Sequence, residues 1–282
     1  MKRMRTKNGQ RTPEQLREHY EIEKELASRL RDAPKAERRL LYSSLYDELF
    51  RRVPLHPQLT QKRSPEESTV AVERQMRFLR RFLTDDCVFM ELGPGDCAVS
   101  FEAARFAKRV YAIDVCDEIS KAETTPDNFS LILSDGCSIP VPPASVDVAF
   151  SNQLMEHLHP DDALEQLREV FDALAPGGCY ICVTPNKLTG PHDISTYFDE
   201  VATGFHLREY TISELTALFR TVGFSKVRLH AGARGVYPRF PAAPLTLCER
   251  MLSALPFKVR YPIAHSLPFR LLFGGVRLVA IR

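Results

Sequence analysis

The stretch Val88-Phe89-Met90-Glu91-Leu92-Gly93-Pro94-Gly95-Asp96-Cys97-Ala98 decides the fold of this 282-residue chain. A short apolar run ends near the acidic Glu91, then turns through Gly93 and Gly95 into Ala- and Val-containing sequence with helical character. An apolar strand, a Gly-x-Gly turn and a helix together form the first strand–loop–helix unit of a nucleotide-binding α/β sheet. The glycines alone leave the nucleotide open.

From residue 87 onward, strand-like and helix-like segments alternate, as in a parallel sheet with crossover helices. We expect strands at residues 87–92, 110–114, 129–133, 146–150, 179–183, 224–231 and 276–281. We expect helices over residues 98–108, 161–174 and 211–223, the first of them opened by the glycine turn. The pattern predicts an α/β, Rossmann-like, mostly parallel sheet of seven strands.

The N-terminal third is predicted to be helical. Capping boxes at residues 12–15 and 64–67 predict helices that begin at Pro13 and Pro65, the latter running to about Leu83. Between them, a helix is expected over residues 34–52. These helices can stabilise the sheet as a cap, close over an acceptor pocket as a lid, or do both.

The domain organisation follows from these segments. We expect an N-terminal helical cap (residues 1–85), a core (86–231), a helical insertion (232–275) and the final strand of the core (276–282).

The composition indicates a folded, cytoplasmic protein. Apolar residues make up 44% of the chain and charged residues 26%. Residues 1–5 are basic, but no apolar region follows them, so no signal peptide is expected. The seven cysteines are odd in number and mostly lie in predicted strands or sheet loops, which is typical of reduced, buried thiols.

Acidic and amide side chains follow the predicted strands. In an open parallel sheet, ligands bind beyond the carboxyl ends of the strands. A diphosphate there would prefer backbone donors or cations to a cluster of carboxylates. Acidic and amide side chains suit a ligand with an ammonium group, a sulfonium, a ribose diol and an exocyclic amine better. S-adenosylmethionine is such a ligand. These side chains are Glu91, Asp114, Asp135 and Asn152.

With this loop and these strand ends, the chain resembles the class I S-adenosylmethionine-dependent methyltransferases. The resemblance covers residues 86–231, with 276–281 as the family's final antiparallel strand. It implies that Glu91 faces the methionine amino group and that Gly93 and Gly95 let the backbone approach the cofactor. It also implies that Asp114 holds the ribose hydroxyls.

The later motifs extend the resemblance. Asp135 and Gly136 match the position that reads the adenine amine, and Asn152 and Gln153 match residues that line the methionine side of the cofactor. One residue departs from the family pattern, because Cys97 stands where a third glycine is common.

Methyl transfer from a sulfonium is an in-line displacement, so the protein mainly positions the two reactants and excludes water. No metal is required, but an oxygen acceptor needs a general base, for which histidine is suited near neutral pH. His192 and His206 lie in the long irregular segment 186–210, and we expect one of them to be that base. The alternative is that each only bonds backbone within a folded loop. We assign His157 and Tyr210 to the acceptor side, with His157 also ordering the loop beside the methionine portion.

The insertion at 232–275 mixes prolines and apolar groups with basic residues. It can form two short helices that wall the acceptor site, contact an anionic membrane that presents a lipid-linked acceptor, or pack on the N-terminal helices. Nucleic acid is not an expected partner, because the basic residues lack interleaved aromatic platforms.

Two other functions fit part of the sequence. An NAD(P)-dependent oxidoreductase would satisfy the glycine fingerprint with Asp114, but not Glu91 directly before the loop or Asp135-Gly136 after the third strand. A non-catalytic cofactor-binding protein would keep the loop and transfer nothing. For a methyltransferase, the acceptor can be a small molecule, a sugar or a lipid-linked species.

Overall fold

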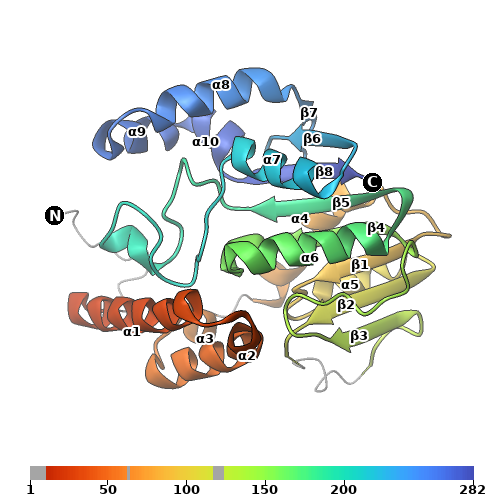
Figure 1. Cartoon of the computed structure of the whole chain (residues 1–282), viewed down its shortest axis with the longest axis horizontal. Coiled ribbons are helices and arrows are strands. Elements are labelled where there is room, and N and C mark those ends of the chain that lie inside the picture. Colours follow the sequence, from red (N-terminus) through yellow and green to blue (C-terminus); the bar gives the residue numbers. More distant parts are fainter. Residues whose placement is uncertain (1–10, 62–63, 117–123) are drawn as a thin grey trace.

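The computed structural model describes residues 11–61, 64–116 and 124–282, so the basic segment 1–5 lies outside the described residues. One sheet with the strand order β3-β2-β1-β4-β5-β8-β6-β7 runs through the molecule (Figure 1). Its strands are β1 (Val88–Leu92), β2 (Arg109–Asp114), β3 (Phe129–Leu133), β4 (Val146–Asn152), β5 (Leu174–Thr184), β6 (Lys226–His230), β7 (Arg239–Phe240) and β8 (Val276–Ile281).

The strand pairing confirms the predicted Rossmann-like architecture. The pairs β1–β2, β1–β4, β2–β3 and β4–β5 are parallel, and β8 is antiparallel to both β5 and β6. All seven predicted strands are present. The additional strand β7 is only two residues long, too short to show an alternating pattern in the sequence.

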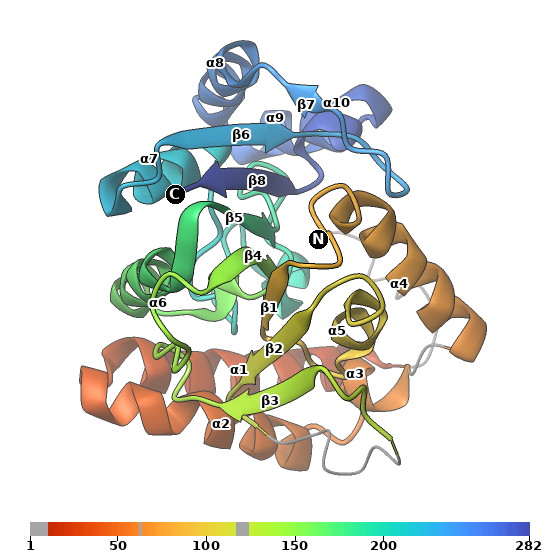
Figure 2. The same ribbon diagram turned by 90° about the vertical axis from the view of Figure 1, so that its right-hand side faces the viewer.

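Helices cover both faces of the sheet (Figure 2). Neighbouring residues of β1 point to opposite faces, so Phe89 packs with one pair of helices and Met90 packs with the other. The first pair is α4 (Pro65–Leu79) and α5 (Ala98–Ala103), and the second is α6 (Pro160–Ala173) and α7 (Ile212–Val222).

Three element boundaries differ from prediction. Helix α4 ends at Leu79 rather than near residue 83. Helix α5 ends at Ala103 rather than at Lys108, because the chain must turn before β2 begins at Arg109. Strand β5 starts at Leu174 rather than at residue 179, and its register against β4 shifts between Val146 and Val148.

The N-terminal helices are α1 (Pro13–Asp32), α2 (Lys35–Arg52) and α3 (Pro57–Thr60). The predicted capping boxes of α1 and α4 are both present. Helix α2 packs on α6 through Arg38, whose guanidinium makes two 2.7 Å bonds to the fully buried carboxylate of Asp162. The Tyr42 hydroxyl donates a third bond, also 2.7 Å, to the same carboxylate.

The insertion forms three helices rather than two, α8 (Ala242–Ser253), α9 (Phe257–Ala264) and α10 (Leu267–Phe273). They lie beside the β6–β8 end of the sheet, at the top of Figure 1. Two short 3-10 helices, η2 (Met155–His157) and η3 (Ile194–Tyr197), follow β4 and β5. Within the described ranges, no helix combines the length and apolar character needed to cross a membrane.

Candidate active site

The glycine loop after β1 has an unusual backbone. Gly93, Gly95 and Cys97 have φ values of +63°, +57° and +54°, a left-handed conformation that favours glycine. A Cβ added at Gly95 would meet no atom within 4 Å, so the loop backbone is open there to an approaching ligand. Asp114, at the end of β2, accepts a 3.4 Å hydrogen bond from the Gly95 amide and thereby faces the same loop.

Glu91 lies directly beneath this loop and is almost completely buried. Its carboxyl accepts a 2.5 Å hydrogen bond from the Ser100 hydroxyl, and burial raises its pKa to about 8. A cation beside Glu91 would replace the missing water and favour the ionised form. The site therefore fits the ammonium group of S-adenosylmethionine.

The third strand end is built jointly with the cap. Asp135 accepts hydrogen bonds from the Cys137 and Ser138 amides and forms a 2.7 Å ion pair with Arg39 of α2. Gly136 has a φ of +87°, and a Cβ there would lie 3.1 Å from the Tyr42 ring, also of α2. The position expected to read adenine is thus fixed by a helix far away in sequence.

Asn152 and Gln153, at the end of β4, line a cavity of about 580 Å³ that also borders β5 and the insertion. Its lining includes Arg234, Arg270 and Arg277 with three histidines, and none of its described residues is acidic. This cavity is therefore suited to an anionic group.

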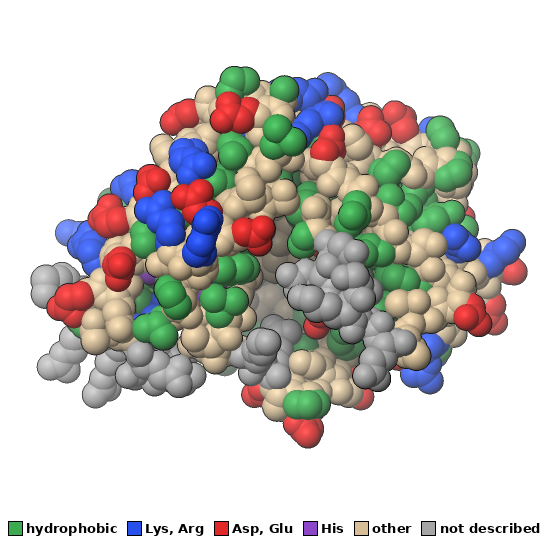
Figure 3. Space-filling model, turned by 90° about the horizontal axis from the view of Figure 1, so that it is seen from below, with side chains coloured by type: hydrophobic (Ala, Val, Ile, Leu, Met, Phe, Trp, Pro, Cys, Tyr) green, Lys and Arg blue, Asp and Glu red, His purple; other side chains and the backbone are tan. Residues whose placement is uncertain are grey.

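A second cavity, of about 380 Å³, lies between α1, α3 and the segments after β4 and β5. Five of the eight histidines of the chain line it, and they are His19, His56, His157, His192 and His206. Tyr210, which we expected at the acceptor, is only 2% exposed and packs in the core. Figure 3 shows the molecule from below, with a hollow near the centre of that face.

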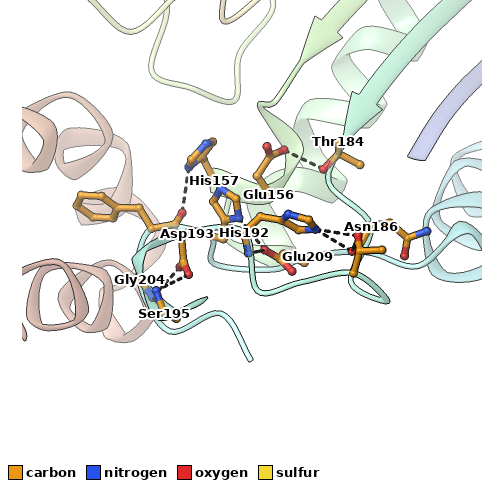
Figure 4. A network of polar contacts seen from close by, with 12 residues as sticks. Glu156, His157, Thr184, Asn186, His192, Asp193, Ser195, Gly204 and Glu209 are labelled. Atoms are coloured by element: carbon orange, nitrogen blue, oxygen red, sulfur yellow. Dashed lines mark hydrogen bonds and ion pairs between the residues drawn. The ribbon is translucent and has the colours of Figure 1, made fainter. Parts of the chain in front are cut away.

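His192 lines both cavities. Figure 4 shows its ring directed toward Asn186. Its Nε2 lies 3.2 Å from the Asn186 carbonyl and 3.0 Å from the Thr189 hydroxyl. Because a carbonyl oxygen only accepts, we assign the proton to Nε2 and the lone pair to Nδ1. The ring is solvent-exposed, yet the surrounding loop desolvates it enough to lower its pKa.

His206 and His157 lie nearby with their Nδ1 atoms engaged. His206 Nδ1 is 2.8 Å from the Glu209 carboxylate. Burial disfavours the charged form of His206, but Glu209 and the neighbouring carboxylates favour it more strongly, so the pKa of His206 is raised. His157 Nδ1 is 3.1 Å from the Phe205 carbonyl, and burial lowers its pKa to about 4. His157 is therefore neutral near pH 7.

The sequence analysis missed two buried carboxylates of this region. Glu156 accepts a 2.8 Å bond from the Thr184 hydroxyl through Oε2, while its Oε1 is buried without a hydrogen-bond partner among the described residues. Glu209 Oε1 accepts from His206 and from the His192 amide at 2.7 Å. The adjacent Glu156-His157 and the spacing His206-x-x-Glu209 are the sequence signals that point to them.

Comparisons with known proteins find methyltransferases by sequence and by fold. Residues 90–182 match the methyltransferase domain family. A probable S-adenosylmethionine-dependent methyltransferase of Mycolicibacterium smegmatis is 34% identical over 137 residues, covering 48% of this chain and 51% of the relative. One from Mycobacterium tuberculosis is 29% identical over 161 residues, covering 55% and 56%. The chain spans about half the length of these curated relatives.

Solved structures share the fold. An S-adenosylmethionine-dependent methyltransferase from Archaeoglobus fulgidus has a TM-score of 0.52 at 16% identity, covering 86% of this chain and 100% of that chain. One from Mesorhizobium loti has a TM-score of 0.50 at 15% identity, covering 76% and 100%. The fold and the sequence matches indicate one class of protein: residues 90–182 match a methyltransferase domain, and the relatives are probable S-adenosylmethionine-dependent methyltransferases. Its cofactor is S-adenosylmethionine rather than the nicotinamide dinucleotide that the glycine loop alone allowed.

Proposed function

We propose that the protein transfers a methyl group from S-adenosylmethionine to an oxygen atom of a small-molecule, sugar or lipid-linked acceptor. When bound, S-adenosylmethionine supplies a methyl group activated by its sulfonium. The observation that carries the proposal is the position of His192, whose Nδ1 lone pair is free on a wall shared by two cavities. One of these cavities begins at Asn152 and Gln153, the predicted methionine side of the cofactor.

The cofactor residues keep the roles that the resemblance implies. Glu91 holds the amino group, Asp114 holds the ribose diol, and Gly93 and Gly95 let the backbone approach. Burial of Glu91 and the positive φ angles of both glycines support these roles. Asp135 and Gly136 form the adenine edge, where Arg39 holds the Asp135 carboxylate in place.

Of the two candidate bases, His192 is the better supported. A general base must be neutral, with a lone pair directed toward the acceptor. His192 meets the first condition because its pKa is lowered, and the Nε2 proton held by backbone and Thr189 leaves the Nδ1 lone pair for the acceptor. His206 has a raised pKa and binds Glu209, which favours its protonated form.

The acceptor is proposed to carry an anionic group such as a phosphate or carboxylate. The larger cavity has three arginines and no described acidic residue. Arg277 is held in place by stacking on the Tyr237 ring, 3.4 Å from its centroid. A fixed guanidinium of this kind suits bidentate binding of a carboxylate or phosphate.

The insertion is proposed to contact an anionic membrane surface. Leu247, Met251 and Leu267 are 60%, 66% and 71% exposed, a high value for large apolar side chains. Basic residues lie among them, namely Arg250, Lys258, Arg260 and Arg270. Apolar groups interspersed with Lys and Arg are the composition of interfacial helices, and such contact would bring the enzyme to a lipid-linked acceptor.

The test of transfer combines binding and turnover. We expect the full chain to bind S-adenosylhomocysteine in calorimetry and to label acceptors from a panel of sugars and lipid headgroups, each with and without phosphate. His192→Gln is expected to slow transfer by about 10²–10⁴-fold at saturating donor, with unchanged S-adenosylhomocysteine affinity. His159→Gln, outside both cavity linings, is the matched control. If His192→Gln and His159→Gln transfer at the same rate, His192 is not the base; if NAD alone binds, the proposal fails.

Membrane contact has a separate test. Leu247→Glu with Met251→Glu is expected to abolish co-sedimentation with anionic vesicles. Leu40→Glu is the control, because Leu40 is 73% exposed on α2, away from the insertion. Equal sedimentation of both variants would contradict the membrane proposal and leave the transfer proposal untouched.

A further inference from the structure

Three side chains beside the histidine-lined cavity converge on one point. Glu156, His157 and His206 each offer a ligand atom, and these atoms lie within 4.8 Å of one another. Glu156 and His157 follow β4, whereas His206 comes from the loop after β5. Figure 4 shows Glu156 and His157 side by side at the ends of these strands.

The hydrogen bonds around this cluster leave its ligand atoms free. His157 donates from Nδ1 to the Phe205 carbonyl, and His206 donates from Nδ1 to the Glu209 carboxylate. Among the described residues, neither Nε2 has a hydrogen-bond partner, and a metal ion would displace the Nε2 proton of a protonated His206. This is the arrangement found around metal-binding histidines, where the second nitrogen donates to a carbonyl or carboxylate and fixes the tautomer.

Glu156 supplies the independent observation. Its side chain is fully buried, and Oε1 has no hydrogen-bond partner among the described residues, although Oε2 is bonded to Thr184. A buried carboxylate oxygen without a donor is costly unless a cation or proton compensates it.

Two other groups of possible ligands, His19 with Glu23 and His56, and Cys137 with Asp162 and Glu165, have carboxylates that are already bonded. In the first, His19 uses Nδ1 for Arg11 and Nε2 for Glu23, and Glu23 uses its other oxygen for the Phe205 amide. In the second group, both carboxylate oxygens of Asp162 already accept hydrogen bonds from Arg38, and one also accepts from Tyr42. Only the Glu156 cluster combines oriented rings with an unpartnered buried oxygen among the described residues.

We propose that Glu156, His157 and His206 bind one divalent transition-metal ion, such as Zn²⁺ or Mn²⁺. Two imidazoles and one carboxylate favour such ions over Mg²⁺ or Ca²⁺, which prefer oxygen ligands. Ligand bonds of about 2.0–2.2 Å need three ligand atoms close together, and those of Glu156, His157 and His206 lie within 4.8 Å of one another. This site revises the sequence prediction that no metal takes part.

The ion would have open coordination positions. His157 and His206 both line the cavity whereas Glu156 does not, so an ion held by these three residues would be accessible to a ligand in the cavity. A metal at this place would orient an acceptor oxygen and lower its pKa. The metal site itself rests on the side chains alone and does not depend on the proposed methyl transfer.

The test measures binding directly, with neither donor nor acceptor present. We expect the metal-free full chain to bind one equivalent of Zn²⁺ in calorimetry, and to give visible d–d absorption with one equivalent of Co²⁺. Glu156→Gln keeps the shape and the Thr184 bond, and is expected to lower Zn²⁺ affinity by at least about 100-fold, since loss of an outer partner already costs 10–100-fold. His206→Ala is expected to do the same.

His19→Gln is the matched control, because it removes a histidine from the same cavity without touching the proposed ligands. Retained Zn²⁺ binding in this variant supports the assignment. The proposal is overturned if the unmodified chain binds no ion, if Glu156→Gln binds as tightly as the unmodified chain, or if His19→Gln loses binding while Glu156→Gln keeps it. If His206→Ala fails to fold in circular dichroism, Glu156→Gln decides alone.

Discussion

The two halves of the site are assembled differently. The glycine-loop half comes from one continuous stretch, residues 88–98, with the adjacent strand end at Asp114. The histidine-lined half gathers side chains from residue 19 to residue 206. Local backbone conformation shapes the first half, whereas the second exists only when the cap and the loop after β5 are packed together.

The largest effect is expected where the cap meets the core. Arg38→Ala leaves the carboxylate of Asp162 buried with its ion-pair partner removed, and should lower the free energy of unfolding by about 3–5 kcal/mol. Urea denaturation measures this loss. Arg29→Ala is the control, because its ion pair with Glu48 is partly exposed and should contribute less than about 1 kcal/mol. Equal losses would show that this pair does not hold the cap.

The next effect concerns the local half. Glu91→Ala should weaken S-adenosylhomocysteine binding by about 1.5–3 kcal/mol, roughly 10- to 150-fold, because a charged hydrogen-bond partner of the amino group is lost. Calorimetry measures the change, and the control is Glu102→Ala in α5, which removes a carboxylate whose ion pair with Arg105 is partly exposed. Unchanged affinity in Glu91→Ala would mean that the buried carboxyl does not meet the ligand.

The affinity for S-adenosylhomocysteine should also depend on pH through Glu91. The pKa of Glu91 is raised to about 8, chiefly by burial, whereas a cationic ligand requires its ionised form. Affinity for S-adenosylhomocysteine should therefore rise with pH, by up to about tenfold per unit, until pH about 8. The contribution of Glu91 to the stability of the free protein has the opposite sign: it is fully present below the unfolded pKa and is lost as pH rises toward 8.

Calorimetry at several pH values, with Glu91→Gln as control, separates this dependence from other groups. Glu91→Gln has no ionisable carboxyl at this position, so its affinity should vary less with pH. A slope that is the same in both proteins would assign the titration elsewhere.

The smallest effect is expected at Cys97. Its φ of +54° is unfavourable for a residue with a side chain, but its thiol is fully buried. Cys97→Gly removes the unfavourable backbone strain but also removes the buried thiol. Because these two effects oppose each other, the free energy of unfolding should change by less than about 1 kcal/mol. Cys97→Val, β-branched, should cost more. A large loss in Cys97→Gly would show that the loop depends on the thiol rather than on its backbone.

The sequence was sufficient for the fold and for the strand-end residues because their signals are local. Alternating segments placed the strands, and the strand ends placed Glu91, Asp114 and Asn152 at one edge of the sheet. It was insufficient wherever a distant segment completes the site. The sequence around Asp135 does not predict its ion pair with Arg39. The sequences around His19 and His56 do not indicate that both line one cavity.

The loop after β5 shows why the remainder was missed. His192 and His206 were singled out by residue type, and the structure brings both to the cavity. Tyr210 was singled out in the same way, but it bridges to Asn186 where the chain returns to the sheet, and its ring packs inward. Residue type does not reveal which side of a loop faces the core.

The backbone of Phe205 joins the cap to the core. Its amide donates to Glu23 of α1, and its carbonyl accepts from His157 after β4. Arg31 of α1 also binds the carbonyls of Thr203 and Gly204. A chimera that takes only the loop or only the first helix from a relative would leave these groups without partners. The two segments should therefore be exchanged as a single cassette when new acceptor preferences are engineered.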